Sequence, residues 1–389
     1  MKTDRHGNSR RVLVAHNVER HGWGGMARLS ESLHTALEEF GWNTEYFTSD
    51  DVEHIKSTRV RRHSFAWYAR RHVRKAFLRG EPYDIVNIHE SAGAATVLGK
   101  SRLGSPAVVA MVYGVELRYW EMRKRTDAYT PDFPTLRERV SVPLLTLWQS
   151  KLTVRRADYV LCSNQQDRAF LQSRLHVDGT KITPIVPGAG PEFSSVASRR
   201  AYARPCTKVL FPGTWLARKG IVQVVDAFSV LASKHPSLQL GVLGAGCPEA
   251  RVLRDFPEGI RSRIKIFPPL PHQGCAEVFL DYDIFLLPSF FEGTPLSLIE
   301  GMYTGIPVIT TNTAGMKDVI EDGQNGLLVT PGSAGEIVRA VETLMADASL
   351  RERLGRRGLA DATSKYTWRA AAEIVNGVYS GLLKGNDRK

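Results

Sequence analysis

The sequence predicts an α/β protein made of two Rossmann-like domains in tandem, and three observations support this fold class. Short apolar, β-branched runs alternate with helical patterns along almost the whole chain, as in parallel sheets covered by helices on both faces. A glycine-bearing turn follows the first strand of each half, in VLVAHNVERHGWGG and in VLFPGTWLARKG. The length of 389 residues suits two domains that each bury a core.

The predicted strands are short runs of β-branched and apolar residues. They span 12–15, 84–88, 107–112, 158–162 and 182–186 in the first half, and 208–211, 238–243, 263–267, 283–287, 307–310 and 327–329 in the second. Apolar residues at three- and four-residue steps predict helices over 26–40 and 221–231, and Gly41 ends the first of them.

A stretch rich in Pro, Gly, Ser and Ala, PGAGPEFSSVASRRAYARP, separates the two halves. We therefore predict an N-terminal domain over 1–190, a linker over 191–206 and a C-terminal domain over 207–367. In such a pair of domains a ligand is expected between them, at the carboxyl ends of the strands.

The composition is that of an ordinary globular protein, with 43% hydrophobic and 24% charged residues, which excludes disordered, collagenous and coiled-coil classes. The four cysteines lie at least 28 residues apart, so they fit neither a zinc site nor a redox motif, and we expect mostly buried thiols. No apolar run approaches the roughly 20 residues of a membrane span. We expect a cytoplasmic protein, bound at most peripherally to the inner face of a membrane.

The net charge of +12, from 52 basic and 40 acidic residues, favours an anionic partner. Eight Lys or Arg and no acidic residue fall between Arg59 and Arg79, interleaved with aromatic residues. On a helix this segment forms either a surface that binds anionic lipid or the cationic outer face of an ordinary core helix. Nucleic acid is not expected, because no recognised binding module accompanies the charge.

Two glutamates, Glu292 and Glu300, provide the strongest chemical signal. A predicted strand leads into a loop with Gly293 and Pro295, and a helix is expected from about Leu296. Backbone N–H groups at that helix start would face a bound phosphate, and the two carboxylates could accept hydrogen bonds from sugar and ribose hydroxyls. Taken alone, such a pair is more often a solvated helix residue and a partner of the helix dipole.

The surrounding stretch, Pro288 to Gly332, resembles the signature of glycosyltransferase family 4 (glycosyl transferases group 1), the retaining, nucleotide-sugar-dependent enzymes of the GT-B fold. Further motifs match in order: Gly24, Gly25 and Arg28; Gly213, Lys219 and Gly220; Gly305, Pro307 and Val308; Asp322, Gly323 and Gly326 to Val329. The resemblance is strong over 209–331 and weaker in the N-terminal half. It implies two Rossmann-like domains facing each other across a cleft, with the last helix, about 368–389, packing back on the first.

The resemblance also implies roles for individual residues. Glu300 is expected to bind the ribose, Glu292 a hydroxyl of the donor sugar, and Lys219 the diphosphate as the glycosidic bond breaks. Lys219, Glu292 and Arg218 are the expected catalytic residues. The expected donor-binding residues are Gly24, Gly25, Gly213, Lys219, Glu292, Gly293, Thr294, Pro295, Leu296 and Glu300. Arg28 equally fits a surface ion-pair residue.

The sequence departs from the family pattern at two positions. Thr214 stands where the family usually has arginine, and we hypothesise that Arg218 supplies the charge instead. Tyr113, before Gly114, stands where many members have histidine, and tyrosine cannot take the protonated role of an imidazole. His16, Tyr113 and Gly114 are expected contacts of the sugar or the acceptor.

No metal and no cofactor are expected. Asp281 and Asp283 form an Asp-x-Asp triplet, but it precedes its strand, so its carboxylates would lie at the wrong end of the sheet. His16, Glu19 and His21 lack further ligands at diagnostic spacing. Gly244 and Gly246 make only half a dinucleotide fingerprint, so NAD is not expected.

The sequence thus predicts a retaining, metal-independent glycosyltransferase that moves a sugar from a nucleoside diphosphate sugar to a glycan or lipid-linked acceptor, in cell-surface polysaccharide or glycolipid synthesis. The alternative is a non-catalytic subunit that binds a sugar nucleotide or glycan with a degenerate site, for which Thr214 and Tyr113 argue. An epimerase or a phosphorylase of similar fold has no motif in its favour. The donor base, the sugar and the acceptor stay open.

Overall fold

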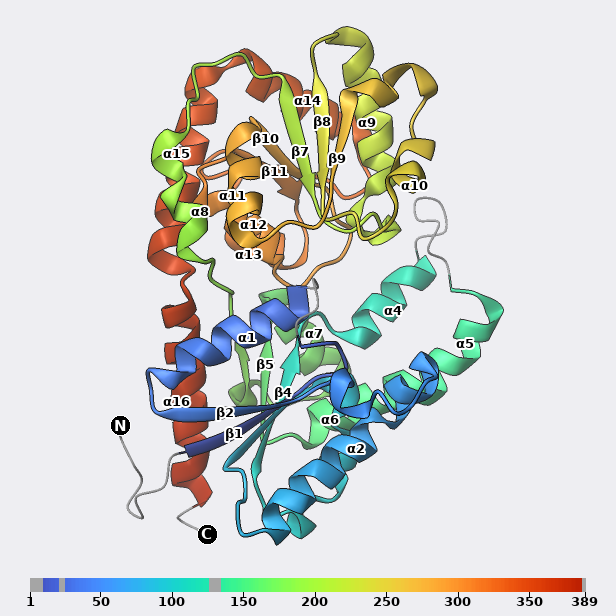
Figure 1. Ribbon diagram of the computed structural model, residues 1–389, viewed down its shortest axis with the longest axis vertical. Coiled ribbons are helices and arrows are strands. Elements are labelled where there is room, and N and C mark those ends of the chain that lie inside the picture. The colour runs from blue at the N-terminus through green and yellow to red at the C-terminus, as the bar shows by residue number, and fades with distance from the viewer. Residues whose placement is uncertain (1–9, 21–24, 126–133, 387–389) are drawn as a thin grey trace. The chain divides into compact units, whose positions relative to one another are not determined.

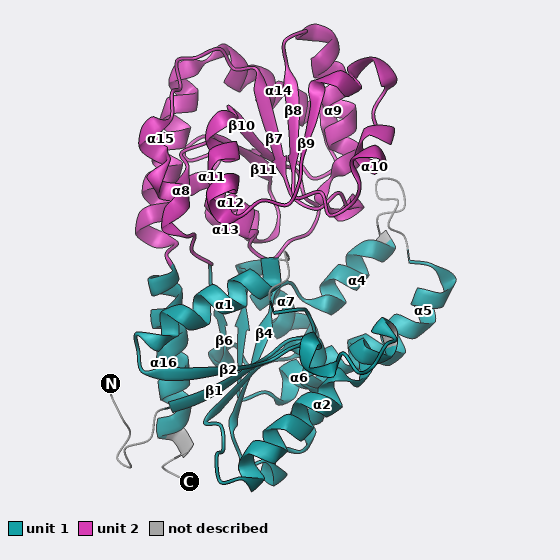
Figure 2. Cartoon of the chain, in the orientation of Figure 1, with its two compact units in different colours: residues 1–124, 134–186, 368–389 teal, residues 125–133, 187–367 magenta. Residues whose placement is uncertain are grey.

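The computed structural model describes residues 10–20, 25–125 and 134–386. The chain divides into two compact units (Figure 2). Unit 1 contains the described residues up to 124, residues 134–186 and the chain from Trp368 onward, and unit 2 contains residues 187–367. Each unit has its own six-stranded parallel sheet covered by helices, so the two-domain Rossmann-like fold class is confirmed.

The sheet of unit 1 has the strand order β2-β1-β3-β4-β5-β6, with all neighbours parallel. Its strands are β1 (Arg10–Ala15), β2 (Trp42–Phe47), β3 (Ile85–His89), β4 (Ala107–Val112), β5 (Tyr159–Cys162) and β6 (Ile182–Pro184). The sequence analysis misses β2. Only Trp42 and Phe47 of this edge strand are buried, so it lacks the continuous apolar run by which the other strands were predicted.

Helices of unit 1 pack on both faces of this sheet (Figure 1). They are α1 (Gly25–Glu38), α2 (Thr58–Leu78), α3 (Ala94–Leu98), α4 (Glu116–Arg125), α5 (Leu136–Val142), the π-helical segment η4 (Pro143–Leu147), α6 (Trp148–Arg156), α7 (Gln165–Leu175) and α16 (Trp368–Asn386). Val12 and Val14 of β1 face the core under α1 and α16, whereas Leu13 and Ala15 face the core under α2. This alternation is the two-residue period of a strand buried on both faces.

The C-terminal helix α16 completes the first of these cores. Its Tyr379 is fully buried, and the Tyr379 hydroxyl accepts a hydrogen bond of 2.6 Å from the Asn87 amide in β3. Trp42 in β2 donates its indole N–H to Asn376 over 3.0 Å. Because α16 contacts α1 and the two strands, the end of the chain is an integral part of unit 1.

The sheet of unit 2 has the order β12-β11-β10-β7-β8-β9, again with all neighbours parallel. Its strands are β7 (Lys208–Pro212), β8 (Gln239–Leu243), β9 (Ile264–Phe267), β10 (Ile284–Leu287), β11 (Val308–Thr311) and β12 (Leu327–Val329). The main helices are α8 (Pro191–Ser195), α9 (Ile221–Lys234), α10 (Glu249–Arg254), α11 (His272–Asp281), α12 (Leu296–Tyr303), α13 (Ala314–Val319), α14 (Ala334–Ala346) and α15 (Ala348–Lys365). All six predicted strands of this half are present.

The prediction of a linker over 191–206 is wrong, because this segment is packed into unit 2. The partly buried guanidinium of Arg200 donates to the carbonyls of Phe279, Tyr282 and Thr304 over 2.7–2.9 Å, at the C-terminal ends of α11 and α12. Burial lowers the pKa of Arg200 to about 10. Carbonyls at helix ends have no partner within the helix, so an arginine satisfies them well. A polar, proline-containing segment can therefore resemble a linker and still be anchored.

Two expectations from composition can be compared with the structure. No helix in the described parts of the chain is both long enough and apolar enough to cross a membrane. All four cysteines are free thiols, with Cys162 and Cys206 buried and Cys247 and Cys275 partly buried. Half of the thiols are therefore fully buried, fewer than expected.

We predict that Arg200→Met destabilises the chain by about 3 kcal/mol, because the substitution leaves three carbonyl oxygens of two helix ends without their charged donor. Urea unfolding of the full chain measures the effect. The matched control is Arg199→Met, since neighbouring Arg199 pairs with Glu277 on the surface. Equal midpoints for the two variants would mean that Arg200 does not anchor the segment.

Candidate active site

Unit 2 places two buried glutamates beside the carboxyl end of β10. Glu292 lies in the loop from β10 to α12 and is 8% exposed, and Glu300 lies just over one turn into α12 and is 5% exposed. The residue before the helix is Pro295, and no side chain caps the start of α12. The first N–H groups of the helix are therefore not taken up by a capping side chain, as suits an anion site.

One carboxylate oxygen of Glu292 receives two cations. Lys219 Nζ lies 2.7 Å and Arg218 Nη1 2.5 Å from Glu292 Oε1. Both cations come from the short 3-10 helix η7 (Ala217–Lys219), which follows β7. The backbone N–H of Phe290 also donates to the Arg218 carbonyl over 2.8 Å, so the two loops are joined through main chain as well as side chains.

The close approach of these loops requires a glycine. Gly220 ends η7 with a φ of +76°, and a Cβ built on it would lie 2.2 Å from the carbonyl oxygen of Pro288. A side chain at this position would push η7 away from the β10–α12 loop. Gly220 thereby helps to hold Lys219 against Glu292.

The charges at this site do not balance. Lys219 and Arg218 together carry two positive charges against the single negative charge of Glu292. Burial would raise the pKa of Glu292, but the two cations lower it below its usual value. Burial, together with Arg218, lowers the pKa of Lys219, and Glu292 only partly opposes this. The surplus positive charge makes the site suited to an anionic ligand.

Two residues that the sequence reasoning missed support the loop from its other side. Gly315 in α13 donates its N–H to the Gly293 carbonyl over 2.9 Å, and a Cβ on Gly315 would lie 2.1 Å from that same oxygen. Ala314 has a φ of +48°, an unfavourable conformation for a residue with a side chain. In the sequence, Gly315 can be noticed as a glycine shortly after a predicted strand. The strain at Ala314 can be recognised only from its backbone angles.

The remaining predicted residues of unit 2 lie around the same loops. Gly213 follows β7, and a Cβ on it would lie 3.6 Å from the Lys219 stem, an ordinary contact distance. Thr214 is exposed, and its methyl group lies 3.3 Å from where a Cβ on Gly246 would be. Thr294, Pro295 and Leu296 form the end of the loop and the first residue of α12.

Of the residues expected in the first half, Gly24 lies outside the described residues. Gly25 is the exposed first residue of α1, and Arg28 lies one turn further along the helix. His16 is 3% exposed just after β1; burial lowers its pKa, and its Nδ1 lies 3.2 Å from the Val18 carbonyl. Tyr113 stacks on His89, which places it at the end of β4 beside β3.

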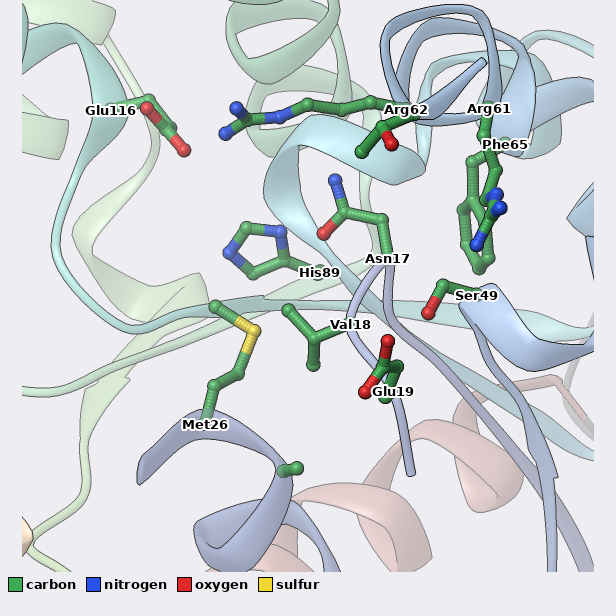
Figure 3. Close-up of a pocket in the computed structure, with 12 residues that line it drawn as sticks. Asn17, Val18, Glu19, Met26, Ser49, Arg61, Arg62, Phe65, His89 and Glu116 are labelled. Carbon is green, nitrogen blue, oxygen red and sulfur yellow. The ribbon is translucent and has the colours of Figure 1, made fainter. Parts of the chain in front are cut away.

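Unit 1 also contains a pocket of about 590 Å³, shown in Figure 3. Asn17, Val18, Glu19, Met26, Ala27, Ser49, Thr58, Arg61, Arg62, Phe65, His89 and Glu116 line it. These residues follow strands β1 to β4 or lie at the starts of α1, α2 and α4. The sequence analysis did not assemble this pocket, because its charged side chains come from segments that only the fold brings together.

The structure describes most of the residues that the sequence offered as metal ligands. Among the described residues, no group of three or more His, Cys, Asp and Glu side chains is arranged to hold a metal ion. Asp281 pairs with Lys208 over 2.8 Å and Asp283 with Arg204 over 2.7 Å, before β10, at the opposite end of the strand from Glu292. His21 lies outside the described residues.

Known proteins share the fold described above. The fold is the GT-B fold of glycosyltransferases: a sucrose-phosphate synthase from Thermosynechococcus elongatus superposes with a TM-score of 0.77 at 18% identity, covering 97% of this chain and 100% of that one. Residues 204–361 match the model of the family described as glycosyl transferases group 1. This range contains Lys219, Glu292 and Glu300. The matched region lies within unit 2 and covers less than half of the chain.

Two curated relatives illustrate the range of similar proteins. An alpha-D-kanosaminyltransferase from Streptomyces kanamyceticus is 26% identical over 285 residues, which are 70% of this chain and 72% of that protein. A D-inositol 3-phosphate glycosyltransferase from Corynebacterium jeikeium is 29% identical over 252 residues, which are 60% of each protein. The match thus spans less than two thirds of the second relative.

We predict that Glu292→Gln destabilises the protein by about 3 kcal/mol at neutral pH, because it leaves two cations around an uncharged side chain. The pKa of Glu292 is lowered in the folded state, so the stabilisation it provides is present above the usual carboxyl range and is lost as the pH falls through the lowered pKa. The difference from wild type should therefore shrink on acidification, as measured by urea unfolding at several pH values.

The control is Glu342→Gln, which removes a carboxylate that pairs with Lys234 at the surface. We expect this variant to unfold close to wild type at every pH. A pH-independent difference for Glu292→Gln would show that the loss comes from packing and not from charge.

Proposed function

We propose that this protein is a retaining, metal-independent glycosyltransferase that uses a nucleoside diphosphate sugar as donor. The observation that carries the proposal is the carboxylate of Glu292, buried and shared by Lys219 and Arg218 with one positive charge in excess. A diphosphate would neutralise that charge and raise the lowered pKa of Lys219 again. The family match of unit 2 supports a donor site at this position.

In this proposal Glu300 binds the ribose hydroxyls and Glu292 a hydroxyl of the donor sugar. The backbone from Gly293 to Leu296 lies against the diphosphate, at the uncapped start of α12. Lys219 and Arg218 stabilise the negative charge that develops on the leaving diphosphate. These groups supply the positive charge that a bound metal ion provides in other phosphate-transfer sites.

The proposed reaction retains the configuration of the anomeric carbon. The bond from that carbon to the diphosphate oxygen breaks, and the acceptor oxygen forms a new bond on the same face of the sugar. The acceptor proton passes to an oxygen of the leaving diphosphate, so the reaction needs no dedicated base from the protein. Positioning and electrostatic stabilisation then provide the rate enhancement.

Unit 1 is proposed to bind the acceptor, a glycan or a lipid-linked molecule, in cell-surface polysaccharide or glycolipid synthesis at the cytoplasmic face of a membrane. Helix α2 buries Phe65, Ala69 and Val73 and leaves Arg71, Arg74 and Lys75 exposed. Trp67 on the outer face of this helix is 58% exposed. Exposed cations beside an exposed tryptophan fit an anionic lipid surface.

An apolar row on a second helical segment adds to this surface. Leu136, Val140, Leu144 and Trp148 follow each other at four-residue steps along α5, η4 and α6, and all four are exposed. Large apolar side chains gathered in one row on a helix mark an interaction surface. We assign the row to the same lipid contact as α2.

The donor site predicts a specific response to nucleotide sugars. In a thermal-shift screen of UDP-, GDP- and ADP-sugars with excess EDTA, one nucleotide class should stabilise the protein, and Glu300→Ala should lose the response. A ligand at about a hundred times its Kd adds roughly 2.7 kcal/mol to stability. The control Glu258→Ala removes an exposed glutamate of the same unit and should respond like wild type.

Turnover with the donor so found tests the rest of the mechanism. The anomer of the product, determined by NMR, should be the same as that of the donor. An inverted product would contradict the retaining mechanism, and binding without any transfer would favour the non-catalytic alternative. Stabilisation only without EDTA would contradict metal independence.

The membrane contact predicts flotation with anionic liposomes at low salt. Arg71→Gln with Arg74→Gln should weaken binding by roughly 30-fold, at about 1 kcal/mol for each basic residue near the surface. The matched control is Arg254→Gln with Lys317→Gln, which removes two exposed cations from unit 2. Equal losses in the two double variants, or no flotation of wild type, would rule out α2 as the contact surface.

A further inference from the structure

The pocket of unit 1 brings together charges of both signs. Arg61 and Arg62 enter it from the first turns of α2, Glu116 from the first residue of α4, and Glu19 from the loop after β1. Figure 3 shows Arg62 extended across the pocket toward Glu116, with the ring of His89 below it. The pocket thus offers donors for an anion and acceptors for hydroxyl groups around one open space of about 590 Å³.

Arg62 is the feature that points to a ligand. Its side chain is exposed to solvent at the pocket, and among the described residues it has no hydrogen-bond partner and no carboxylate within ion-pair distance. Burial raises the pKa of Glu116, and the charge of Arg62 opposes this only partly, at longer range. Arg61 differs, because its Nε donates to the Ile55 carbonyl over 3.1 Å, which fixes the side chain in place. A guanidinium with five donors and no acceptor is suited to a phosphate or carboxylate.

His89 supplies a neutral group beside the two arginines. It is 6% exposed, and its Nδ1 lies 3.0 Å from Ser91 Oγ. Burial, aided by the charges of His16 and Arg62, lowers the pKa of His89 to about 3, so the ring is uncharged at neutral pH. A neutral imidazole that lines a pocket can bond a hydroxyl as donor or acceptor, according to its tautomer.

Glu116 is held in place by its backbone. Its N–H donates to Glu90 Oε1 over 2.7 Å, and the other oxygen of Glu90 accepts from Ser150 over 2.9 Å. The Glu116 side chain is therefore free to act in the pocket, while the buried Glu90 fixes the start of α4. A carboxylate of fixed position beside a neutral histidine suits a vicinal pair of hydroxyls.

We propose that this pocket binds a phosphorylated polyhydroxyl compound, with the phosphate on Arg62 and Arg61 and the hydroxyls on Glu116 and His89. The two guanidinium groups provide the donors that phosphate oxygens require. The identification of this compound as the acceptor rests on the proposed transferase function, whereas phosphate binding itself does not. The phosphate can belong to a free sugar phosphate or to a lipid headgroup.

The test uses glucose 6-phosphate, inorganic phosphate and glucose as probes with the full chain, in calorimetry without donor. Glucose 6-phosphate should bind, and Arg62→Gln should weaken it roughly ten- to a hundredfold, the range for losing charged hydrogen bonds. Glu116→Gln should strengthen the binding of inorganic phosphate, because it removes a carboxylate that repels the anion. Arg156→Gln, which removes an exposed arginine of α6 in the same unit, is the matched control.

Several outcomes would overturn the proposal: equal effects of Arg62→Gln and Arg156→Gln, binding of glucosamine in place of glucose 6-phosphate, or no response of inorganic phosphate to either charge change. Vesicles that contain phosphatidic acid distinguish the two sources of the phosphate. Vesicle binding that is lost in Arg62→Gln, without binding of glucose 6-phosphate, identifies a lipid headgroup in the pocket.

The two proposals fail separately. Glu300→Ala, in the other unit, should leave glucose 6-phosphate binding unchanged, and Arg62→Gln should leave the nucleotide response unchanged. If no nucleotide sugar binds but glucose 6-phosphate binds through Arg62, the transferase function is wrong and the phosphate site stands. If nucleotide sugars bind and no phosphorylated probe does, only the pocket assignment is wrong.

Discussion

The buried carboxylate of Glu292, shared by Lys219 and Arg218, is the interaction on which the organisation of unit 2 depends. Charges that are taken out of water must be paired, so this carboxylate joins the loop after β7 to the loop after β10. Gly220 and Gly315 allow main chain to approach within contact distance on either side. The same pairing leaves one cation in excess, so the contact that stabilises the loops also prepares them for an anion.

The sequence predicted unit 2 more completely than unit 1 for a physical reason. Strands buried on both faces are continuous apolar runs, and β7, β8, β10 and β11 of unit 2 are buried over all or nearly all of their length. The edge strand β2 is half polar and was missed. The supposed linker was misjudged because Arg200, a polar residue, forms its anchor.

The two candidate sites also differ in how far the sequence predicted them. Glu292 and Glu300 lie within one recognisable stretch and Lys219 within a second, so a resemblance pointed to all three before the structure placed them in one unit. Arg62 and Glu116 come from segments more than fifty residues apart, and no local pattern connects them. Strain at Ala314 depends on backbone angles that composition does not encode. Motifs therefore locate the part of a site that one loop contains, and the fold is needed for the rest.

The charge states of the two sites also imply different responses to a ligand. In unit 2 both cations already contact Glu292, so in the proposed donor site a diphosphate would compete with that carboxylate for Lys219 and Arg218. In unit 1 Arg62 has no carboxylate within ion-pair distance among the described residues, so a phosphate displaces nothing there. Donor binding then requires rearrangement of an existing ion pair, whereas phosphate binding in unit 1 requires only desolvation of a free charge.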